Sequence, residues 1–297
     1  MLDDDVSMTL DLGEPPQEVL DYAREHIGES PDTRLRLLQD LRDMVYERGE
    51  VQPHRMDDSF LLRFLRARHF VVERAHRLLV NYYNFKENNP DLHKNINPLS
   101  LRYISEDDVV LVLPYREQTG RRVLIYRMGN WNPRNYSVEE IFKATVIVLE
   151  LAILEQRAQV LGGVCIFDLG GLSLQHAWSM TPQVANRVVQ LMGGSFPIRT
   201  HAIHIVNQSW VFDIVFALFK PLLDERMRER IYFHGNDWES LHQHINPKFL
   251  PERYGGTRPE YNYTEWMDSL QAIPKIREEI RSLGYIVDDD ATSEETR

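Results

Sequence analysis

The first third of the chain carries apolar residues at helical spacing. The pattern covers the segments 16–27, 32–48, 57–68 and 71–86. Apolar residues that recur every three or four positions form one face of a helix. Asn89 and Pro90 then end the pattern, because proline disfavours a helical conformation at the residue before it. We therefore predict an all-helical N-terminal domain over residues 1–95 that begins with an acidic tail.

Beyond residue 108 the pattern changes to short β-branched runs that alternate with helical stretches. We predict strands at 109–113, 123–126, 164–167, 202–206 and 231–233, and helices at 138–159, 183–192 and 212–219. Such alternation is typical of an α/β fold with a mainly parallel sheet flanked by helices. The first two runs are separated by a short connection at 116–120, which predicts one antiparallel pair. We place this second domain at 96–262, followed by a C-terminal helix and an acidic tail at 263–297.

The composition is that of a soluble globular protein, with 43% hydrophobic and 27% charged residues among 297. The net charge of −11 is concentrated at the ends, because residues 1–20 hold six acidic residues and no Lys or Arg, and residues 286–297 hold five against one Arg. The body is therefore close to neutral, and Arg and Lys gather between residues 59 and 86. We expect no nucleic-acid partner, whereas an anionic membrane surface remains possible.

Targeting and redox signals are sparse. No apolar run reaches the ~20 residues of a membrane span, and the acidic N-terminus argues against a secretory signal. The single cysteine, Cys165, excludes an intrachain disulfide and a Cys-based zinc cluster. We expect a cytoplasmic monomer without a cofactor.

Enzyme signatures are weak. The Gly-Gly pairs lack nucleotide-binding spacing, and Ser173 lies in a Gly-Gly-Leu-Ser-Leu stretch without the second glycine of a nucleophile elbow. An esterase that uses Ser173 and His176 is therefore a distant alternative. The histidine pairs 201/204 and 242/244 match metal-ligand spacing only loosely, and we assign them structural roles.

Two segments are more apolar than an amphipathic surface helix. Residues 144–154 are apolar except for Thr145 and Glu150, and residues 210–219 are interrupted only by Asp213. They are either buried core helices or the wall and the lid of a cavity for a lipophilic ligand. We expect that Phe212, Val215, Phe216 and Phe219 cannot all face inward from one helix, so that part of this set is exposed or covers a mobile seam. Arg226 and Arg230 follow this segment on one helix face, an arrangement that suits a bilayer interface if nearby acidic residues do not neutralise them.

Eight stretches in colinear order resemble the CRAL-TRIO lipid-binding family across about residues 57–257. They are 60–68 (FLLRFLRAR), 123–127 (VLIYR), 166–170 (IFDLG), 195–197 (SFP), 203–207 (IHIVN), 220–223 (KPLL), 234–236 (HGN) and 250–256 (LPERYGG). The resemblance implies a helical domain followed by an α/β domain, which encloses one hydrophobic ligand behind a mobile lid helix.

Site residues follow from the resemblance by position. The pocket and lid set comprises Phe142, Thr145, Val146, Leu149, Ile166, Asp168, Val188, Leu191, Phe212, Val215, Phe216, Leu218 and Phe219, and we add Ser173 as a group that could orient a hydroxyl or carbonyl. The phosphoinositide set comprises Arg68, Arg226 and Arg230, with Lys220, with His201 in place of a basic residue of the family, and with Arg199 as its substitute. We expect Arg68, Arg226 and Arg230 to converge.

We predict a lipid carrier that binds one tocopherol-, retinoid- or carotenoid-like molecule and exchanges it at membranes that contain phosphoinositides, endosomal or plasma. The alternative is a phosphoinositide-dependent adaptor for membrane trafficking, in which docking itself is the function.

Overall fold

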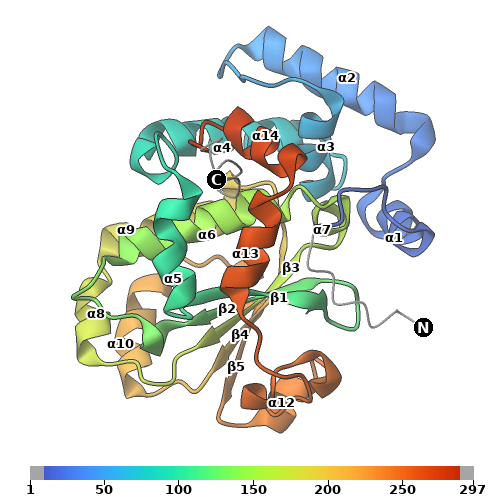
Figure 1. The fold of residues 1–297 in the computed structure, drawn as a ribbon. Helices are drawn as coiled ribbons and strands as arrows, with labels where there is room; N and C mark the ends of the chain where they lie inside the picture. The colour runs from blue at the N-terminus through green and yellow to red at the C-terminus, as the bar shows by residue number, and fades with distance from the viewer. Residues whose placement is uncertain (1–9, 288–297) are drawn as a thin grey trace, which may run out of the picture.

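The predicted strands form one five-stranded sheet with the order β1-β2-β3-β4-β5 in a computed structural model that describes residues 10–287 (Figure 1). The strands are β1 (Val110–Arg116), β2 (Arg122–Arg127), β3 (Gly163–Asp168), β4 (Thr200–Val206) and β5 (Ile231–Gly235). β1 and β2 are antiparallel and the other neighbours are parallel, as predicted. The acidic ends, 1–9 and 288–297, lie outside the described residues.

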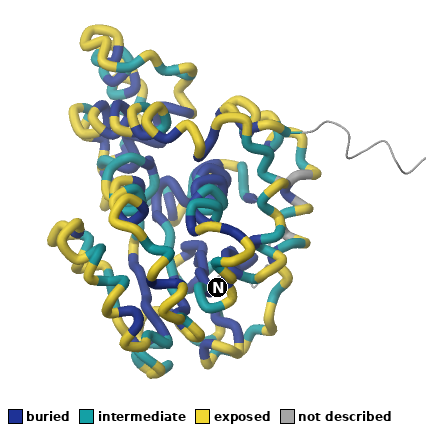
Figure 2. The backbone as a smooth tube through the Cα atoms, turned by 90° about the vertical axis from the view of Figure 1, so that its left-hand side faces the viewer, coloured by how far each residue is buried: buried dark blue, intermediate teal, exposed yellow. Residues whose placement is uncertain are grey.

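The N-terminal region is helical. It contains α1 (Gln17–Tyr22), which continues into a π-helical turn (Ala23–Ile27), then α2 (Pro31–Arg48), α3 (Asp58–Ala67) and α4 (Val72–Asn88). Short 3₁₀ turns follow at Pro90–Leu92 and Pro98–Leu101. α2 extends away from the rest of the molecule, and most of its surface is exposed (Figures 1 and 2).

Helices flank the sheet in the mixed α/β region. They are α5 (Arg102–Glu106), α6 (Val138–Ala152), α7 (Gln156–Leu161), α8 (Leu174–Ser179), α9 (Pro182–Gln190), α10 (Trp210–Phe219), α11 (Glu225–Arg228) and α12 (Trp238–His242). The chain then forms α13 (Tyr263–Gln271) and α14 (Pro274–Ser282). The expected single C-terminal helix is therefore two helices, because Pro274 begins a new one after Ile273.

The helix predicted at 138–159 is also divided, into α6 and α7, by the polar residue Glu155. Its carboxylate lies 2.6 Å from Nη2 of Arg122 and 2.9 Å from Nη2 of Arg116, both on the β1-β2 hairpin. These guanidinium groups hold the pKa of Glu155 below its usual value although burial opposes them. A buried charge needs such partners, so the chain turns toward the sheet at this position instead of continuing the helix.

Buried polar contacts connect the N-terminal helices to the α/β region. Arg66 of α3 is fully buried and donates to Glu29 at 2.8 and 2.9 Å. Glu150 of α6 accepts a hydrogen bond from Tyr82 of α4 at 3.0 Å and pairs with Lys86 at 3.0 Å. Removing one member of a buried pair costs about 3–5 kcal/mol, so these contacts hold α6 in a fixed position against the N-terminal helices.

Among residues 10–287, no helix combines the length and the apolar character needed to cross a membrane.

Candidate functional site: an apolar cavity beneath a helix

One face of the sheet and the helices α6, α9 and α10 enclose a cavity of about 240 Å³. This volume is somewhat below the range of ~300–1,000 Å³ for small-molecule sites, and it exceeds the ~150 Å³ of an engineered cavity that binds benzene. Most lining side chains are aliphatic or aromatic. The cavity therefore favours a lipophilic ligand.

Nine of the predicted ligand residues line this cavity. They are Phe142, Thr145 and Leu149 on α6, Val188 on α9, Leu191 just after it, and Phe212, Val215, Phe216 and Phe219 on α10. The apolar character of α6 on more than one side has a structural reason. Ala144, Ile147 and Val148 line a second space on the side of α6 that faces away from the cavity.

Five predicted ligand residues lie away from the cavity lining. Val146 of α6 is buried on another side of the helix. Ile166 and Asp168 point to the opposite face of β3, because side chains alternate along a strand and Cys165 and Phe167 take the cavity face. Leu218 is half-buried on a different face of α10, and Ser173 begins α8.

The Asp168 carboxylate lies on the face of the sheet away from the cavity, where it accepts three hydrogen bonds. The donors are Asn207 Nδ2 at 2.8 Å, the Gly170 amide at 3.0 Å and the Tyr254 hydroxyl at 3.1 Å. Tyr254 in turn accepts from Arg127 Nε at 3.1 Å. These bonds use the lone pairs of Asp168 to fix the end of β3 against the segment that follows β5.

Ser173 and His176 form a helix cap. His176 Nδ1 accepts from the Ser173 amide at 2.9 Å and lies 2.8 Å from the Ser173 hydroxyl, while Nε2 lies 2.7 Å from the carbonyl oxygen of Trp131. Both imidazole nitrogens are therefore engaged in contacts that begin α8. The pair therefore belongs to the local cap of α8.

The inner face of α10 is more complete than we predicted. Phe212, Val215, Phe216 and Phe219 all line the cavity, so the expectation that they could not all face inward is wrong. Their spacing of three, four and seven residues places them on one helix face. The outer face carries Trp210 and Ile214, which are 64% and 47% exposed.

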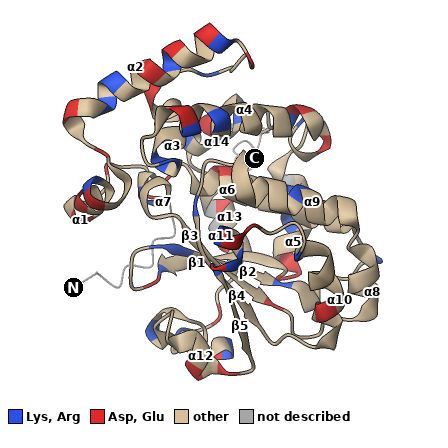
Figure 3. Ribbon diagram, turned by 180° about the vertical axis from the view of Figure 1, so that it is seen from behind, with Lys and Arg blue, Asp and Glu red and all other residues tan. Residues whose placement is uncertain are grey.

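Outward apolar side chains also occur on the neighbouring helix α8. Trp178 is 77% exposed and Leu174 is 38% exposed. Figures 1 and 3 place α8 and α10 side by side, and in Figure 3 α10 is mostly free of charged residues whereas α2 alternates between the two signs. We call Leu174, Trp178, Trp210 and Ile214 the apolar edge.

A short hydroxyl chain is built into the cavity wall. The Tyr126 hydroxyl donates to Thr145 Oγ1 at 3.0 Å, and Thr145 donates to the carbonyl oxygen of Ile141 at 3.0 Å. A carbonyl can only accept, so the direction of both bonds is fixed. The Tyr126 oxygen therefore has acceptor capacity toward the cavity, and both hydroxyl protons are already used.

Sulfur side chains line the cavity and were missed from the sequence. Met128, Met180, Met192 and Met227 come from four separate segments, so no single periodic pattern marks them. Cys165 also lines the wall, and burial raises its pKa to about 12, which keeps the thiol neutral.

A cationic cluster lies where β4 and β5 begin, beside the turn between α3 and α4. Arg199 Nη1 is 3.1 Å from His69 Nε2, and Arg230, which also lines the cavity, donates to the Thr200 carbonyl at 3.2 Å. Burial lowers the pKa of Arg68, and repulsion from Arg230 and then Arg74 lowers it further. The structure thus brings Arg68, Arg199 and Arg230 together, three of the predicted phosphoinositide residues.

Glycine makes the position of Arg199 possible. Gly162 has φ = +78°, and a Cβ there would lie 2.3 Å from the Arg199 carbonyl oxygen. The Gly163 amide donates to the same oxygen at 3.0 Å. Only glycine tolerates both the backbone conformation and this close approach.

The other predicted phosphoinositide residues are exposed. Arg226 lies on α11, Lys220 follows α10, and the Lys220 carbonyl accepts from Arg228 at 2.9 Å. Arg230 is among the groups that act on Arg68, and the convergence of Arg226 with these two stays a prediction. His201 is exposed at the start of β4, near Arg199 and Arg230.

His204 and His244, one from each of the two histidine pairs noted in the sequence, lie together with His234 behind the sheet. His204 is buried, and its Nδ1 lies 2.9 Å from His234 Nε2, while His244 packs within 5.2 Å of it, between ring centroids. Burial and then the neighbouring histidines lower the pKa of His204 to about 3. Over the described part of the chain, no group of three or more His, Cys, Asp or Glu could hold a metal ion.

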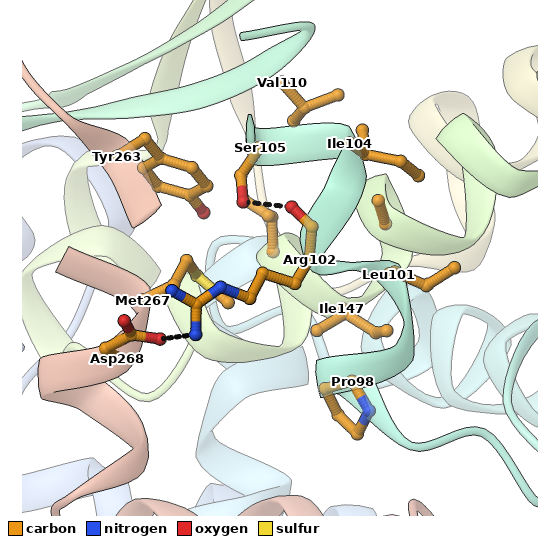
Figure 4. A pocket seen from close by; sticks show the side chains of 12 residues that line it. Pro98, Leu101, Arg102, Ile104, Ser105, Val110, Ile147, Tyr263, Met267 and Asp268 are labelled. Atoms are coloured by element: carbon orange, nitrogen blue, oxygen red, sulfur yellow. Dashed lines mark hydrogen bonds and ion pairs between the residues drawn. The ribbon is translucent and has the colours of Figure 1, made fainter. Parts of the chain in front are cut away.

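The space behind α6 is a packing defect between α5, α6 and α13. Its volume is about 40 Å³, and an ion pair between Arg102 and Asp268 at 3.0 Å crosses its edge (Figure 4). The Ser105 hydroxyl donates to the Arg102 carbonyl at 2.7 Å. This volume accommodates water but not a lipid.

Comparison with known proteins agrees with this architecture. Residues 106–256 match the family model described as the CRAL/TRIO domain, and residues 16–81 match the CRAL/TRIO N-terminal domain. The chain is 38% identical over 256 residues to an alpha-tocopherol transfer protein-like protein of Mus musculus, which covers 86% of this chain and 75% of that protein. It is 35% identical over 255 residues to Clavesin-1 of Xenopus laevis, with 85% and 77% covered. The solved structure of Sfh5 aligns at a TM-score of 0.47 and 18% identity over 80% of this chain and 92% of that one, too distant to carry an argument.

Proposed function

Because the chain belongs to the CRAL/TRIO family, we propose that it carries one lipophilic molecule and exchanges it at membranes that contain phosphoinositides. The family and its relatives support lipid binding. The observation that carries the proposal is the apolar cavity against α10, four of whose side chains line it. A tocopherol-, retinoid- or carotenoid-like cargo suits such a wall, because burial of apolar surface contributes about 25 cal/mol per Å².

Exchange requires α10 to move. The cavity is small for an extended lipid, and four side chains of α10 form part of its wall. The apolar edge on α8 and α10 offers indole and aliphatic side chains that suit the boundary between head groups and acyl chains. We propose that these side chains enter the bilayer while α10 opens, so that cargo passes without crossing water.

Docking is assisted by the cationic cluster. Guanidinium groups hold phosphate oxygens bidentately, and each cation near an anionic surface contributes about 1 kcal/mol. Arg230 is both a cluster residue and a lining residue, so head-group binding and cavity opening are adjacent. The protein would act in the cytoplasm and transiently at endosomal or plasma membranes, without chemical conversion of its cargo.

Transfer of a fluorescent tocopherol or retinoid between vesicles tests this proposal. Fully burying a large apolar side chain contributes about 1.5–3 kcal/mol, so Trp178→Ala with Trp210→Ala should lower vesicle binding and transfer at least about 10-fold. Neither side chain lines the cavity, so equilibrium cargo affinity should persist. Leu35→Ala on α2, a residue 71% exposed, is the matched control.

Transfer that is unchanged in the double variant would contradict the docking surface. Purified protein that extracts without lipid and binds none of these cargo classes would contradict the carrier function itself. Native mass spectrometry of protein from its own tissue would identify the cargo, since a foreign host supplies its own lipids.

The adaptor function is the second candidate, favoured by the similarity to Clavesin-1 and by the cationic cluster. The two functions separate when the cavity is filled by substitution. An adaptor would keep its membrane localisation and its cellular effect, whereas a carrier would lose transfer.

A further inference from the structure

The cationic cluster contains two histidines among its arginines. His69 and His201 are both exposed, and they come from the α3–α4 turn and the start of β4. Arg199 and Arg230 lie near both histidines, and Arg68 lies near His69. The cluster therefore has both permanent charges and groups whose charge depends on pH.

His69 is held in place by its backbone. His69 and Phe70 have φ of 54° and 56°, a left-handed conformation that is uncommon outside glycine. The buried Phe70 ring and the hydrogen bond from its amide to the Leu65 carbonyl at 2.8 Å hold this turn. His69 is thus directed to Arg199, at 3.1 Å between Nε2 and Nη1.

The charged groups that face His69 are all cations. Burial lowers its pKa, and Arg199, Arg74, Arg68 and Arg230 lower it further. Among residues 10–287, none of Arg68, Arg199 and Arg230 forms an ion pair with a carboxylate. Three guanidinium groups without a paired carboxylate indicate a site for an anion.

His201 has a similar environment, which also includes Arg199 and Arg230. Burial and then Arg121 lower its pKa, Glu117 of the β1-β2 hairpin opposes this, and Arg199 and Arg230 lower it again. The Glu117 carboxylate accepts from the amides of Thr119 and Arg121, both at 3.0 Å, so it is largely occupied within its own turn.

We propose that His69 and His201 belong to a phosphate site with Arg68, Arg199 and Arg230, and that they take up protons when a phosphoinositide head group binds, so that membrane docking strengthens as the pH falls. This inference rests on the membrane docking proposed above. In this site Arg68 and Arg230 act with Arg199, His69 and His201. A lysine in place of His201 would stay charged over this pH range and could not make binding depend on pH.

The direction of the pH dependence of head-group affinity follows from the linkage between proton binding and phosphate binding. Burial and then nearby cations lower the pKa of both imidazoles and keep them neutral at neutral pH in the free protein, and a bound phosphate favours their charged form. Binding therefore takes up protons, and affinity rises as pH decreases. Each proton taken up changes the affinity by at most about 10-fold for each pH unit.

The test is flotation with vesicles of phosphatidylcholine that contain phosphatidylinositol bisphosphate, at constant ionic strength from neutral pH to about pH 5.5. Wild type should bind about 10-fold more tightly at the acidic end relative to the double variant His69→Gln, His201→Gln. The head group itself gains protons below about pH 6, which weakens binding of both proteins, so the difference between them is the readout. His54→Gln is the matched control, because His54 faces Lys86, Arg55 and Tyr83 away from this cluster.

Further variants and competing ligands identify what causes the pH dependence of vesicle binding. The variant His69→Lys, His201→Lys should bind tightly with a pH profile that no longer follows wild type. Soluble inositol hexakisphosphate should compete with the vesicles, and phosphatidylserine vesicles of equal charge should show little difference between wild type and the Gln variant. Thermal unfolding of each variant checks that it folds, and the single Gln variants should each remove part of the difference.

Equal pH profiles for wild type and the double Gln variant would overturn the inference. An equal difference on phosphatidylserine would also overturn it, since the histidines would then respond to any anionic surface. Wild-type protein that binds no phosphoinositide vesicle at any pH would instead refute the docking step of the proposed function.

Discussion

Filling the cavity from its wall separates a ligand site from an ordinary core. Leu149 lines the cavity from α6, and Leu149→Trp would place an indole ring in this space. Val146 lies one turn earlier on the same helix, is buried, and does not line the cavity, so Val146→Trp is the matched control. The two substitutions introduce the same ring with opposite expected effects.

The cavity volume sets an upper limit on how much bound cargo can stabilise the protein. Empty apolar space destabilises a protein by about 24 cal/mol per Å³, so a void of 240 Å³ corresponds to at most about 6 kcal/mol. A cargo that fills it can recover up to this amount. At roughly 2–4 °C per kcal/mol, saturating cargo should raise the Tm of delipidated wild type by no more than about 12–24 °C.

Thermal unfolding with and without cargo is the assay. Leu149→Trp should keep or raise the Tm of the free protein and lose most of the cargo-dependent increase, because the ring occupies the ligand volume. Val146→Trp should lower the stability by about 1–3 kcal/mol through overpacking and keep the increase. The reverse pattern, or an equal increase in both variants, would refute the assignment of the cavity as the ligand site.

Two further predictions concern single side chains. Tyr126→Phe removes the free acceptor at the end of the hydroxyl chain, so a lipid alcohol should bind about 3- to 10-fold more weakly while its methyl ether is unaffected; equal losses for both in a fluorescence titration would disprove this contact. His204 stays neutral in the folded protein to about pH 3, whereas the unfolded chain gains its proton near pH 6.5, so the free energy of unfolding should fall as the pH decreases between these values. His204→Phe should flatten that part of the profile in urea unfolding, and an unchanged profile would assign the acid sensitivity to other groups.

The sequence predicted the sheet well and the helix boundaries less well. All five strands lie within three residues of the predicted bounds, since β-branched runs between turns are a local signal. The division of α6 from α7 depends on Glu155 meeting Arg116 and Arg122 across the sheet. A tertiary ion pair of this kind leaves no trace in the local pattern.

Parts of the candidate site also depend on tertiary contacts that the local sequence pattern does not predict. The apolar sequence of α10 was compatible with a cavity wall, and four of its side chains line the cavity, although the inward face was underestimated. Strand alternation could have separated Cys165 and Phe167 from Ile166 and Asp168, because the period along a strand is two. His69 gave no sequence signal, since its relation to Arg199 depends on a turn that only the folded chain forms.

The four thioethers in the cavity wall make cargo retention sensitive to oxidants. Each oxidation to a sulfoxide would introduce a strong dipole into a surface that holds its ligand by excluding water. Unbranched, polarizable methionine side chains also let the wall adapt to cargo of different shape. The adaptability that broadens the range of acceptable lipids would thus make the protein lose retention during oxidative stress while its fold persists.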